Sequence, residues 1–287
     1  MTPKPHEEGM ALVMVLLLLA VAGAALAIMM SGEDAALQRA TMMGNAARAR
    51  AIARAGELSA ITALRRDGDL ANDNAAEPWA NIADRGSPIA GGRFQLAIGD
   101  AQGKLNLNRL VQGDPLTRRR LDIVANALRL PRDTADHIAG FIGVTGPLSD
   151  LDQLAAIGLS APDIARLATM TTALPQGTTI NLNATPEPLL ALLLDNPVAA
   201  RGLIARRART GKLTRDDLAL ERVALPAGTG FASTLFWVRA RATIGGAGQE
   251  LTSLLLRRPL RAGGAEVVAI GRWRGSAAPA QAPALPD

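Results

Sequence analysis

The side chains that could do chemistry are few, and their spacing favours no reaction. The chain has two histidines, His6 and His137, and no cysteine. A nucleophile–histidine–acid arrangement, a multi-histidine zinc site and thiol chemistry are therefore not predicted. Six acidic residues could pair for acid–base work or bind calcium: Asp133, Asp136, Asp150, Asp152, Asp216 and Asp217. They lack the Asp-x-Asp-x-Asp-Gly spacing of an EF-hand, so we interpret them as helix caps and surface charges and predict that the protein is not an enzyme.

An uncharged segment of 21 residues, Met10 to Met30, follows directly after Gly9. As a helix rising ~1.5 Å per residue, it would cover a bilayer core of about 30 Å. Glu7 and Glu8 stand directly before it, and no small-x-small cleavage site or polar region follows a shorter apolar core, as a secretory signal peptide would require. We therefore predict a retained helix that crosses a membrane once.

Composition supports a folded head outside the membrane. The chain has 287 residues, 48% of them hydrophobic, which is enough for one or two domains with their own cores. The net charge of +5 is scattered, with arginine runs at residues 118–120, 206–207 and 257–258. A solvated surface explains these runs, and a nucleic-acid patch stays open as the alternative. With 2% aromatic residues, stacking platforms for single strands are scarce.

Helical periodicity continues beyond the apolar segment. Apolar residues recur at steps of three, four and seven: Leu37, Ala40, Ala47, Ala51, Ala55, Leu58 and Ile61. The pattern predicts one helix from Met10 to about Arg66, ended by Asp67-Gly68-Asp69, with this stripe covered by other parts of the protein.

A change of period divides the rest of the chain. After a predicted loop at residues 68–91, residues 94–98 and 105–107 alternate apolar and polar side chains around a turn at 100–103 and predict a β-hairpin. Short helices are predicted at residues 116–130, 132–142, 149–156, 161–169, 186–194, 199–209 and 215–222. Strand patterns return at 235–244, 249–256 and 266–273. The helical block interrupts the β-layer, which indicates an insertion.

Parts of the helical block are similar to the helix-hairpin-helix units that hold DNA phosphates at a Gly-x-Gly turn. The corresponding turn here is Asp195-Asn196-Pro197, which carries an acid and lacks one N–H donor. The other candidate turn, residues 156–160, has only Gly158 of the glycine pair. We expect the hairpin fold without its phosphate site and predict no nucleic-acid partner. A membrane-anchored DNA-binding protein of a competence or type IV pilus system is the alternative function.

Several motifs together resemble the general secretion pathway protein K family, the large minor pseudopilins of type II secretion. They are the Gly9/Met10 junction, residues 48–64 of the helix, Glu77-Pro78-Trp79, residues 103–108, Leu151-Asp152-Gln153-Leu154 and residues 180–183. The resemblance implies an α+β fold: a pilin-like long N-terminal helix packed on an antiparallel sheet, with an inserted all-helical, helix-hairpin-helix-like domain. It also implies that a prepilin peptidase cuts after Gly9 and that the new terminus, Met10, is methylated.

The same resemblance implies a place at the tip of a short periplasmic pseudopilus, where such a subunit initiates assembly and aids export across the outer membrane. GspI-like and GspJ-like minor pseudopilins are the implied partners. Most related subunits carry glutamate at the fifth mature position, whereas Met14 stands there in this chain. A buried carboxylate needs a partner, so a subunit without one suits an end position. The resemblance also implies that calcium binding is possible, but residues 141–147 contain no acid, so we carry no calcium site over to this segment and assign no metal ligands. We predict no other cofactor.

We divide the chain on this basis. Residues 1–9 form the leader and 10–32 the membrane half of the N-terminal helix. Residues 33–110 and 227–275 form the pilin-like domain, 111–226 the inserted helical domain and 276–287 a disordered tail. We expect a single-pass protein of the inner membrane with its C-terminal head in the periplasm.

Overall fold

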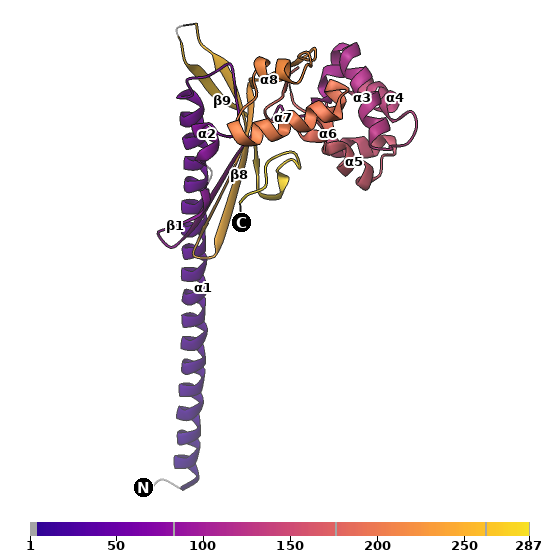
Figure 1. The fold of residues 1–287 in the computed structure, drawn as a ribbon. Helices are drawn as coiled ribbons and strands as arrows, with labels where there is room; N and C mark the ends of the chain where they lie inside the picture. The colour runs from indigo at the N-terminus through magenta and orange to yellow at the C-terminus, as the bar shows by residue number, and fades with distance from the viewer. Residues whose placement is uncertain (1–4, 83, 176, 262, 287) are drawn as a thin grey trace.

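The computed structural model describes residues 5–82, 84–175, 177–261 and 263–286. Figure 1 shows a long helix, α1, whose last part lies along a sheet, and a helical domain that projects sideways near the end of α1 farther from the N-terminus. Residues 1–4 of the predicted leader and residue 287 of the predicted tail lie outside the described residues.

α1 runs without a break from Pro5 to Arg65, 61 residues in all. At ~1.5 Å per residue it is about 90 Å long. The predicted helix from Met10 to about Arg66 is confirmed, and the helix begins five residues earlier, inside the predicted leader. Directly after it, the Asp67 side chain accepts a hydrogen bond from the Asp69 backbone N–H at 3.1 Å, which turns the chain away from the helix axis.

Within the described residues, one antiparallel sheet has the strand order β1-β2-β7-β8-β9. The strands are Asp84–Ile89 (β1), Gly92–Asp100 (β2), Leu235–Ile244 (β7), Ala247–Pro259 (β8) and Ala265–Arg274 (β9). β7 and β8 form a hairpin that turns at Gly245 and Gly246, whose φ angles are 52° and 83°. Positive φ at both positions is what a two-residue hairpin turn requires. The three C-terminal strands agree with the sequence prediction.

The core of the pilin-like body lies between α1 and this sheet. Its buried residues are Ala53, Ala60, Ile61, Leu64, Trp79, Leu96, Phe236, Val238, Ala240, Leu255 and Val267. Gly56 permits the close approach, because a Cβ there would lie 2.8 Å from the Phe94 ring and 3.0 Å from the Ala240 Cβ. The small residues on this side of α1 therefore set how closely helix and sheet pack.

The sequence predicts the wrong buried face for α1. Of the apolar stripe from Leu37 to Ile61, only Ile61 is buried, and Leu37 and Leu58 are 67% and 51% exposed. The sheet instead covers the face of Ala49, Ala53, Gly56, Ala60 and Leu64. Because alanines lie all around this helix, its periodicity is too weak to identify the packed face.

The predicted hairpin between residues 94–98 and 105–107 is also wrong. β2 lies between β1 and β7, while β3 (Leu105–Asn106) pairs in parallel with β4 (Thr171–Thr172). The Asn106 side chain accepts a hydrogen bond from the Asn108 N–H at 3.1 Å and so starts the 3-10 helix η1 (Leu107–Gln112). Three alternating residues were too short a pattern to tell a strand from a capped helical turn.

The predicted loop at residues 68–91 contains the short helix α2 (Pro78–Asn81) and strand β1. Gly86 and Pro88 in β1 are turn-forming residues, which is why the sequence favoured a loop. β1 is an edge strand, and an edge strand tolerates proline because one of its sides needs no N–H donor.

The inserted domain occupies the chain between β2 and β7, as predicted. Its helices are α3 (Pro115–Ala127), α4 (Thr134–Thr145), the 3-10 helix η2 (Leu151–Ile157), α5 (Ala161–Ala168), α6 (Glu187–Leu194), α7 (Pro197–Thr210) and α8 (Arg215–Leu220), with a small parallel pair of β5 (Ile180–Asn181) and β6 (Thr229–Gly230). One apolar cluster gathers α3 to α5, and another gathers α6 to α8. The insertion therefore has two hydrophobic cores of its own.

The C-terminal segment crosses the face of the sheet opposite α1. After the 3-10 helix η3 (Gly275–Ala277), the Gln281 side-chain oxygen accepts hydrogen bonds from Thr172 Oγ at 2.6 Å and from the Ala173 N–H at 3.0 Å. Gln95 Nε2 donates to the Pro286 carbonyl at 2.6 Å. The sequence predicts a disordered tail at 276–287, whereas the structure places its residues up to 286 against the sheet and the insertion.

Candidate functional site: the N-terminal helix and the domain junction

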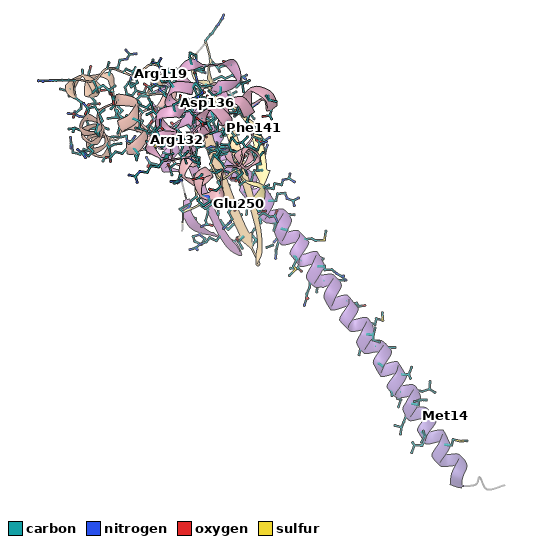
Figure 2. All side chains as sticks on the ribbon, turned by 90° about the vertical axis from the view of Figure 1, so that its right-hand side faces the viewer. Met14, Arg119, Arg132, Asp136, Phe141 and Glu250 are labelled. Atoms are coloured by element: carbon teal, nitrogen blue, oxygen red, sulfur yellow. The ribbon has the colours of Figure 1, made fainter. Side chains whose placement is uncertain are left out.

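The first half of α1 stands free of the head (Figure 2). Its window Leu12–Met29 has a mean hydropathy of 2.9 and is 0% buried, and among the described residues it is the helical segment long and apolar enough to cross a membrane. Exposure of apolar side chains continues to Met43, which is 74% exposed. Such a surface needs lipid or other helices around it, so its length and composition fit a single membrane anchor.

The predicted processing residues lie in the first turns of α1. Gly9 and Met10 are inside the helix, and Met10 is 65% exposed. Met14 lies four residues further on the same face, is 64% exposed and is far from the head in Figure 2. Gly9, Met10 and Met14 thus lie together at one end of the helix, and no described residue of the head contacts them.

The packed half of α1 carries a buried acid that sequence reasoning missed. Glu57 is 1% exposed and accepts hydrogen bonds from Ser253 Oγ at 2.6 Å and from Arg272 Nε and Nη2 at 2.9 Å each. Burial alone would raise the pKa of Glu57, but the bonds from Arg272 and Ser253 hold that pKa below its ordinary value. Glu57 therefore stays ionised and anchors α1 to β8 and β9.

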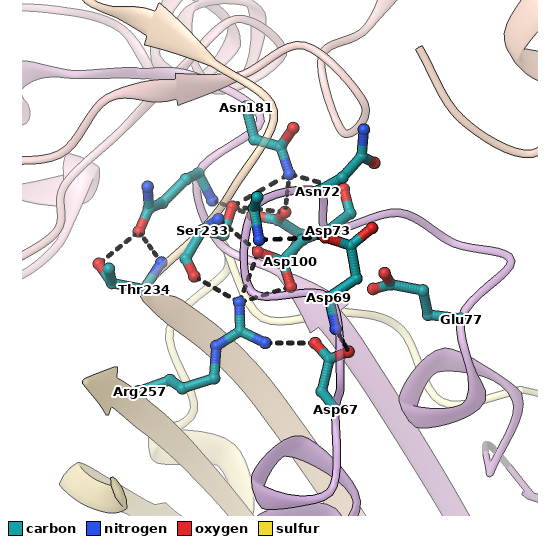
Figure 3. Close-up of polar contacts among 12 residues, drawn as sticks. Asp67, Asp69, Asn72, Asp73, Glu77, Asp100, Asn181, Ser233, Thr234 and Arg257 are labelled. Atoms are coloured by element: carbon teal, nitrogen blue, oxygen red, sulfur yellow. Dashed lines mark hydrogen bonds and ion pairs between the residues drawn. The ribbon is translucent and has the colours of Figure 1, made fainter. Parts of the chain in front are cut away.

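A second group of buried polar residues, the buried junction, lies where α1 ends and the insertion meets the sheet (Figure 3). It consists of Asp67, Asp73, Asp100, Asn181, Ser233 and Arg257. Arg257, on β8, is 2% exposed. Its Nη1 lies 2.5 Å from Asp67 Oδ2, and its Nη2 lies 2.6 and 2.5 Å from the two Asp73 oxygens. One guanidinium thereby ties the segment after α1 to the sheet.

Asp100, at the end of β2, extends the buried junction into the insertion. Its Oδ2 accepts hydrogen bonds from Asn181 Nδ2 at 2.6 Å and from Ser233 Oγ at 2.7 Å. Next to it, the Gln102 side-chain oxygen accepts from the backbone N–H groups of Thr234 and Leu235 at 2.7 and 2.9 Å. The chain enters and leaves the insertion at these positions, so the contacts hold the insertion in one orientation on the pilin-like body.

The buried junction holds three carboxylates and one guanidinium, which bonds to Asp67 and Asp73 but not to Asp100. Burial raises the pKa of Asp73 to about 7 against the opposing effect of Arg257, and the charge of Asp100 adds to the rise. Burial also raises the pKa of Asp100, whose hydrogen bonds only partly offset it. The buried junction therefore contains one carboxyl group, that of Asp73, whose pKa lies near neutral pH.

Two acids of the buried junction and the neighbouring Glu77 form a group that does not fit a calcium ion. Asp67, Asp73 and Glu77 each place one oxygen within 4.8 Å of the others, a spacing that could hold a cation. However, Arg257 already bonds to Asp67 and Asp73, and Glu77 accepts a hydrogen bond from Trp79 Nε1 at 2.6 Å. A divalent cation would meet a fixed positive charge at two of its three ligands.

Both helix-hairpin-helix turns are closed by the protein's own side chains. The Asn196 side chain accepts from the N–H groups of Val198 and Ala199 at 3.1 and 3.0 Å, at the start of α7. At the start of α5, Ser160 Oγ accepts from the Asp163 N–H at 3.3 Å, and Asp163 adds a negative charge. Phosphate would have to displace these caps, so neither turn offers a ready phosphate cradle.

The remaining sequence candidates have structural roles or are solvent-exposed. Asp150 and Asp217 take part in capping boxes at the starts of η2 and α8, which agrees with their interpretation as caps. Asp136 pairs with Arg118 on the surface, and His137 is exposed on α4. Among the described residues, no histidine lies in a buried polar group with a nucleophile and an acid.

The fold defines the class of protein. A single helix that extends far beyond the sheet on which its second half packs, together with a helical insertion between strands, is the architecture of a pilin-like subunit with an added domain (Figure 1).

Comparisons with known proteins make the class more specific. No protein-family model matches the chain. The chain is 25% identical to the type II secretion system protein K of Pseudomonas aeruginosa over 296 aligned residues. The alignment covers 88% of this chain and 89% of the relative. The fold of this chain matches a chain of the crystal structure of the GspK–GspI–GspJ complex from enterotoxigenic Escherichia coli with a TM-score of 0.61 and 19% identity, over 83% of this chain and 99% of that chain. These findings confirm the resemblance to the protein K pseudopilins of type II secretion.

Proposed function

We propose that this chain is the minor pseudopilin at the tip of a type II secretion pseudopilus, that it initiates pseudopilus assembly and that it aids export of folded proteins across the outer membrane. The observation that carries the proposal is the shape of the subunit. The insertion projects sideways beside the end of α1 that is farther from the membrane segment (Figure 1). If subunits stack through their helices, this bulk blocks the place of a further subunit above it, so only an end position accommodates it.

The membrane end of α1 supports the same position. Met14 replaces the glutamate that most related subunits carry, and the surrounding window is 0% buried within this chain. A carboxylate in a bilayer is tolerated only with a partner, and a subunit without a neighbour above has none to offer. An apolar residue at this position removes that requirement.

The partners we propose are a GspI-like and a GspJ-like minor pseudopilin. The matched structure is a complex of GspK with GspI and GspJ. In this chain, the helix face with Ala51, Ala55 and Leu58 is exposed, although its residues suit close helix packing. Mixing the full-length chain in detergent with both partners should give a stable complex by light scattering. Monomers alone at micromolar concentration would contradict the tip assignment.

We further propose that a prepilin peptidase cuts after Gly9, that Met10 is then methylated, and that α1 holds the subunit in the inner membrane with its head in the periplasm. Gly9→Val should leave uncleaved precursor, because the peptidase needs the small residue before the bond. Intact-mass spectrometry of the membrane fraction distinguishes precursor from mature chain. The mature mass in the mutant would refute the leader assignment, and Ala11→Val serves as the matched control that still matures.

In this function the chain is a structural subunit, not an enzyme, and needs no nucleic acid. The DNA-binding alternative predicts a salt-dependent shift of double-stranded DNA by the purified chain. We expect no shift even at low salt, because the two hairpin turns are already capped.

A further inference from the structure

A basic groove opens where the exposed half of α1 enters the head. It has a volume of about 440 Å³ and is lined by Arg50, Ala53, Arg54, Gln249, Glu250, Leu251, Arg272 and Arg274. Figure 2 shows Glu250 at the end of the head from which the exposed half of α1 emerges. The groove thus lies between one face of the helix and the β8–β9 edge of the sheet, next to the surface that other subunits would meet.

Two acids, Glu250 in the lining of the basic groove and Glu57 next to its lining arginines, are already engaged inside the protein. Glu57 accepts a hydrogen bond from Arg272, and its carboxylate lies 3.1 Å from Arg54 Nη1. Glu250 is 7% exposed and bonds to Arg239 at 2.7 Å and to Arg241 at 2.6 Å, on the other face of the sheet. The carboxylates therefore do not neutralise the remaining arginines of the groove.

Arg50 and Arg274 remain as free cations. Arg50 is exposed on α1, Arg274 is exposed at the end of β9, and neither side chain has a hydrogen bond or an ion pair among the described residues. They stand on the two sides of one groove, next to the half-exposed Arg54 and Arg272. A ligand that bears two or more carboxylates would satisfy both sides at once.

Next to the groove, one edge of strand β8 extends beyond its pairing with β9. The β8–β9 ladder ends at the pair Leu251–Arg274, whereas β8 begins at Ala247. Residues 247–250 of β8 therefore extend past the end of the edge strand β9. A short extended segment can pair with such an edge while its side chains reach the arginines.

Lipid headgroups are too far away to occupy the groove. Arg50 lies 21 residues beyond Met29, the end of the apolar window, on an unbroken helix. At ~1.5 Å per residue this is about 30 Å, several times the Debye length of about 8 Å at physiological salt. The complementary charge must therefore come from a molecule beside the head.

We propose that the basic groove is a docking site for a carboxylate-bearing segment of a neighbouring minor pseudopilin, with Arg50 and Arg274 as the residues that determine charge specificity. This inference rests on the proposed function. Opposite charges at the rim guide association and select among partners, while the wrong charge is strongly rejected.

The test uses the full-length chain in detergent and the GspI and GspJ subunits of the same secretion system, with affinity measured by titration calorimetry. Arg50→Glu and Arg274→Glu should each weaken binding by about tenfold, and the double variant by more, because like charges then face each other. Arg119→Glu is the matched control, since Arg119 is also exposed but lies in the inserted domain (Figure 2). It should bind as the unmodified chain does.

The outcomes separate a failure of the docking-site assignment from a failure of the proposed function. If the unmodified chain binds the pair and the double variant binds equally well, the groove is not the docking site, while the proposed function stands. If Arg119→Glu weakens binding as much as the groove variants do, the docking-site assignment is also overturned, because the attraction would then be a non-specific effect of charge. If the unmodified chain binds neither subunit, the proposed function fails and the inference fails with it.

A second arm tests lipid as the occupant. The titrations are repeated in nanodiscs of phosphatidylcholine and of phosphatidylglycerol. The groove assignment predicts the same ratio of affinities between the unmodified chain and the double variant in both. If anionic lipid abolishes that ratio, headgroups compete for the groove and the proposal is overturned.

Discussion

The two halves of α1 are built from similar small and apolar residues, yet one is free and the other is covered by a sheet. In the free half, Met14 is 64% exposed and the apolar window carries no charge. In the covered half, Glu57 is 1% exposed and is held by Arg272 and Ser253. The comparison shows that this helix carries a charge in apolar surroundings only where the fold supplies its partners.

The junction beyond the covered half should be the most sensitive part of the molecule. Arg257→Met removes the counter-charge of Asp67 and Asp73, and losing one partner of a buried ion pair costs about 3–5 kcal/mol of unfolding free energy. Urea unfolding of the full-length chain in detergent, followed by tryptophan fluorescence, measures the loss. Arg119→Met, on the surface, should change stability by less than about 0.5 kcal/mol. A loss below about 1 kcal/mol in Arg257→Met would mean that the junction contributes little.

A pair of glycines on α1 tests the two halves directly. Gly56→Leu should destabilise the head by about 1–3 kcal/mol, because a Cβ at Gly56 already meets Phe94 and Ala240 and overpacking strains the core. Gly44→Leu should be neutral or stabilising by up to ~1 kcal/mol, since nothing lies within 4 Å of its Cβ and leucine favours the helix. Thermal unfolding of both variants provides the comparison. Equal effects would show that the sheet does not pack closely on Gly56.

The buried junction predicts how stability depends on pH. The pKa of Asp73 is raised to about 7 in the folded state, from an ordinary value of 3.8. The protonated carboxyl group therefore stabilises the folded state fully below the unfolded-state pKa, and this stabilisation is lost as pH rises through 7. Stability should therefore fall between pH 5 and pH 7.5 by at most about 1.4 kcal/mol per pH unit. Glu57 acts in the opposite direction, and only at acidic pH, because its pKa is lowered from 4.5.

Asp73→Asn is the control for this pH dependence. Asparagine cannot titrate, so the slope between pH 5 and pH 7.5 should flatten in urea unfolding series. A slope identical to that of the unmodified chain would assign the proton uptake to another group of the buried junction, with Asp100 as the first candidate because its pKa is also raised.

The smallest effect is expected from calcium removal. Arg257 already neutralises two of the three acids that could hold the ion. Adding EGTA should shift the midpoint of thermal unfolding by less than about 1 °C, because a ligand that does not bind the folded state cannot stabilise it. A drop of several degrees, restored by calcium but not by magnesium, would contradict this prediction.

Much of the local structure could be predicted from the sequence. The unbroken helix follows from an uncharged segment followed by helix-forming residues without proline, and α5 begins at residue 161 as predicted, after the Ser160 cap. Helix α7 begins two residues before its predicted range, at Pro197. Strand β7 matches its predicted range because a run of four apolar residues from Leu235 is followed by alternation of polar and apolar residues up to Ile244. Shorter patterns failed, as at residues 105–107, where one asparagine cap decides between strand and helix.

What the sequence by itself determined is therefore the long apolar helix segment that follows Gly9, the presence of Met14 in place of an acid and the interruption of the sheet by helices. Only the tertiary structure decided which face of α1 is buried, because an alanine-rich helix looks similar from every side. It alone also formed the buried junction, where Asp67 and Arg257 meet across 190 positions of sequence. Local periodicity reports neighbours three or four residues apart, whereas contacts between distant segments depend on how the elements pack.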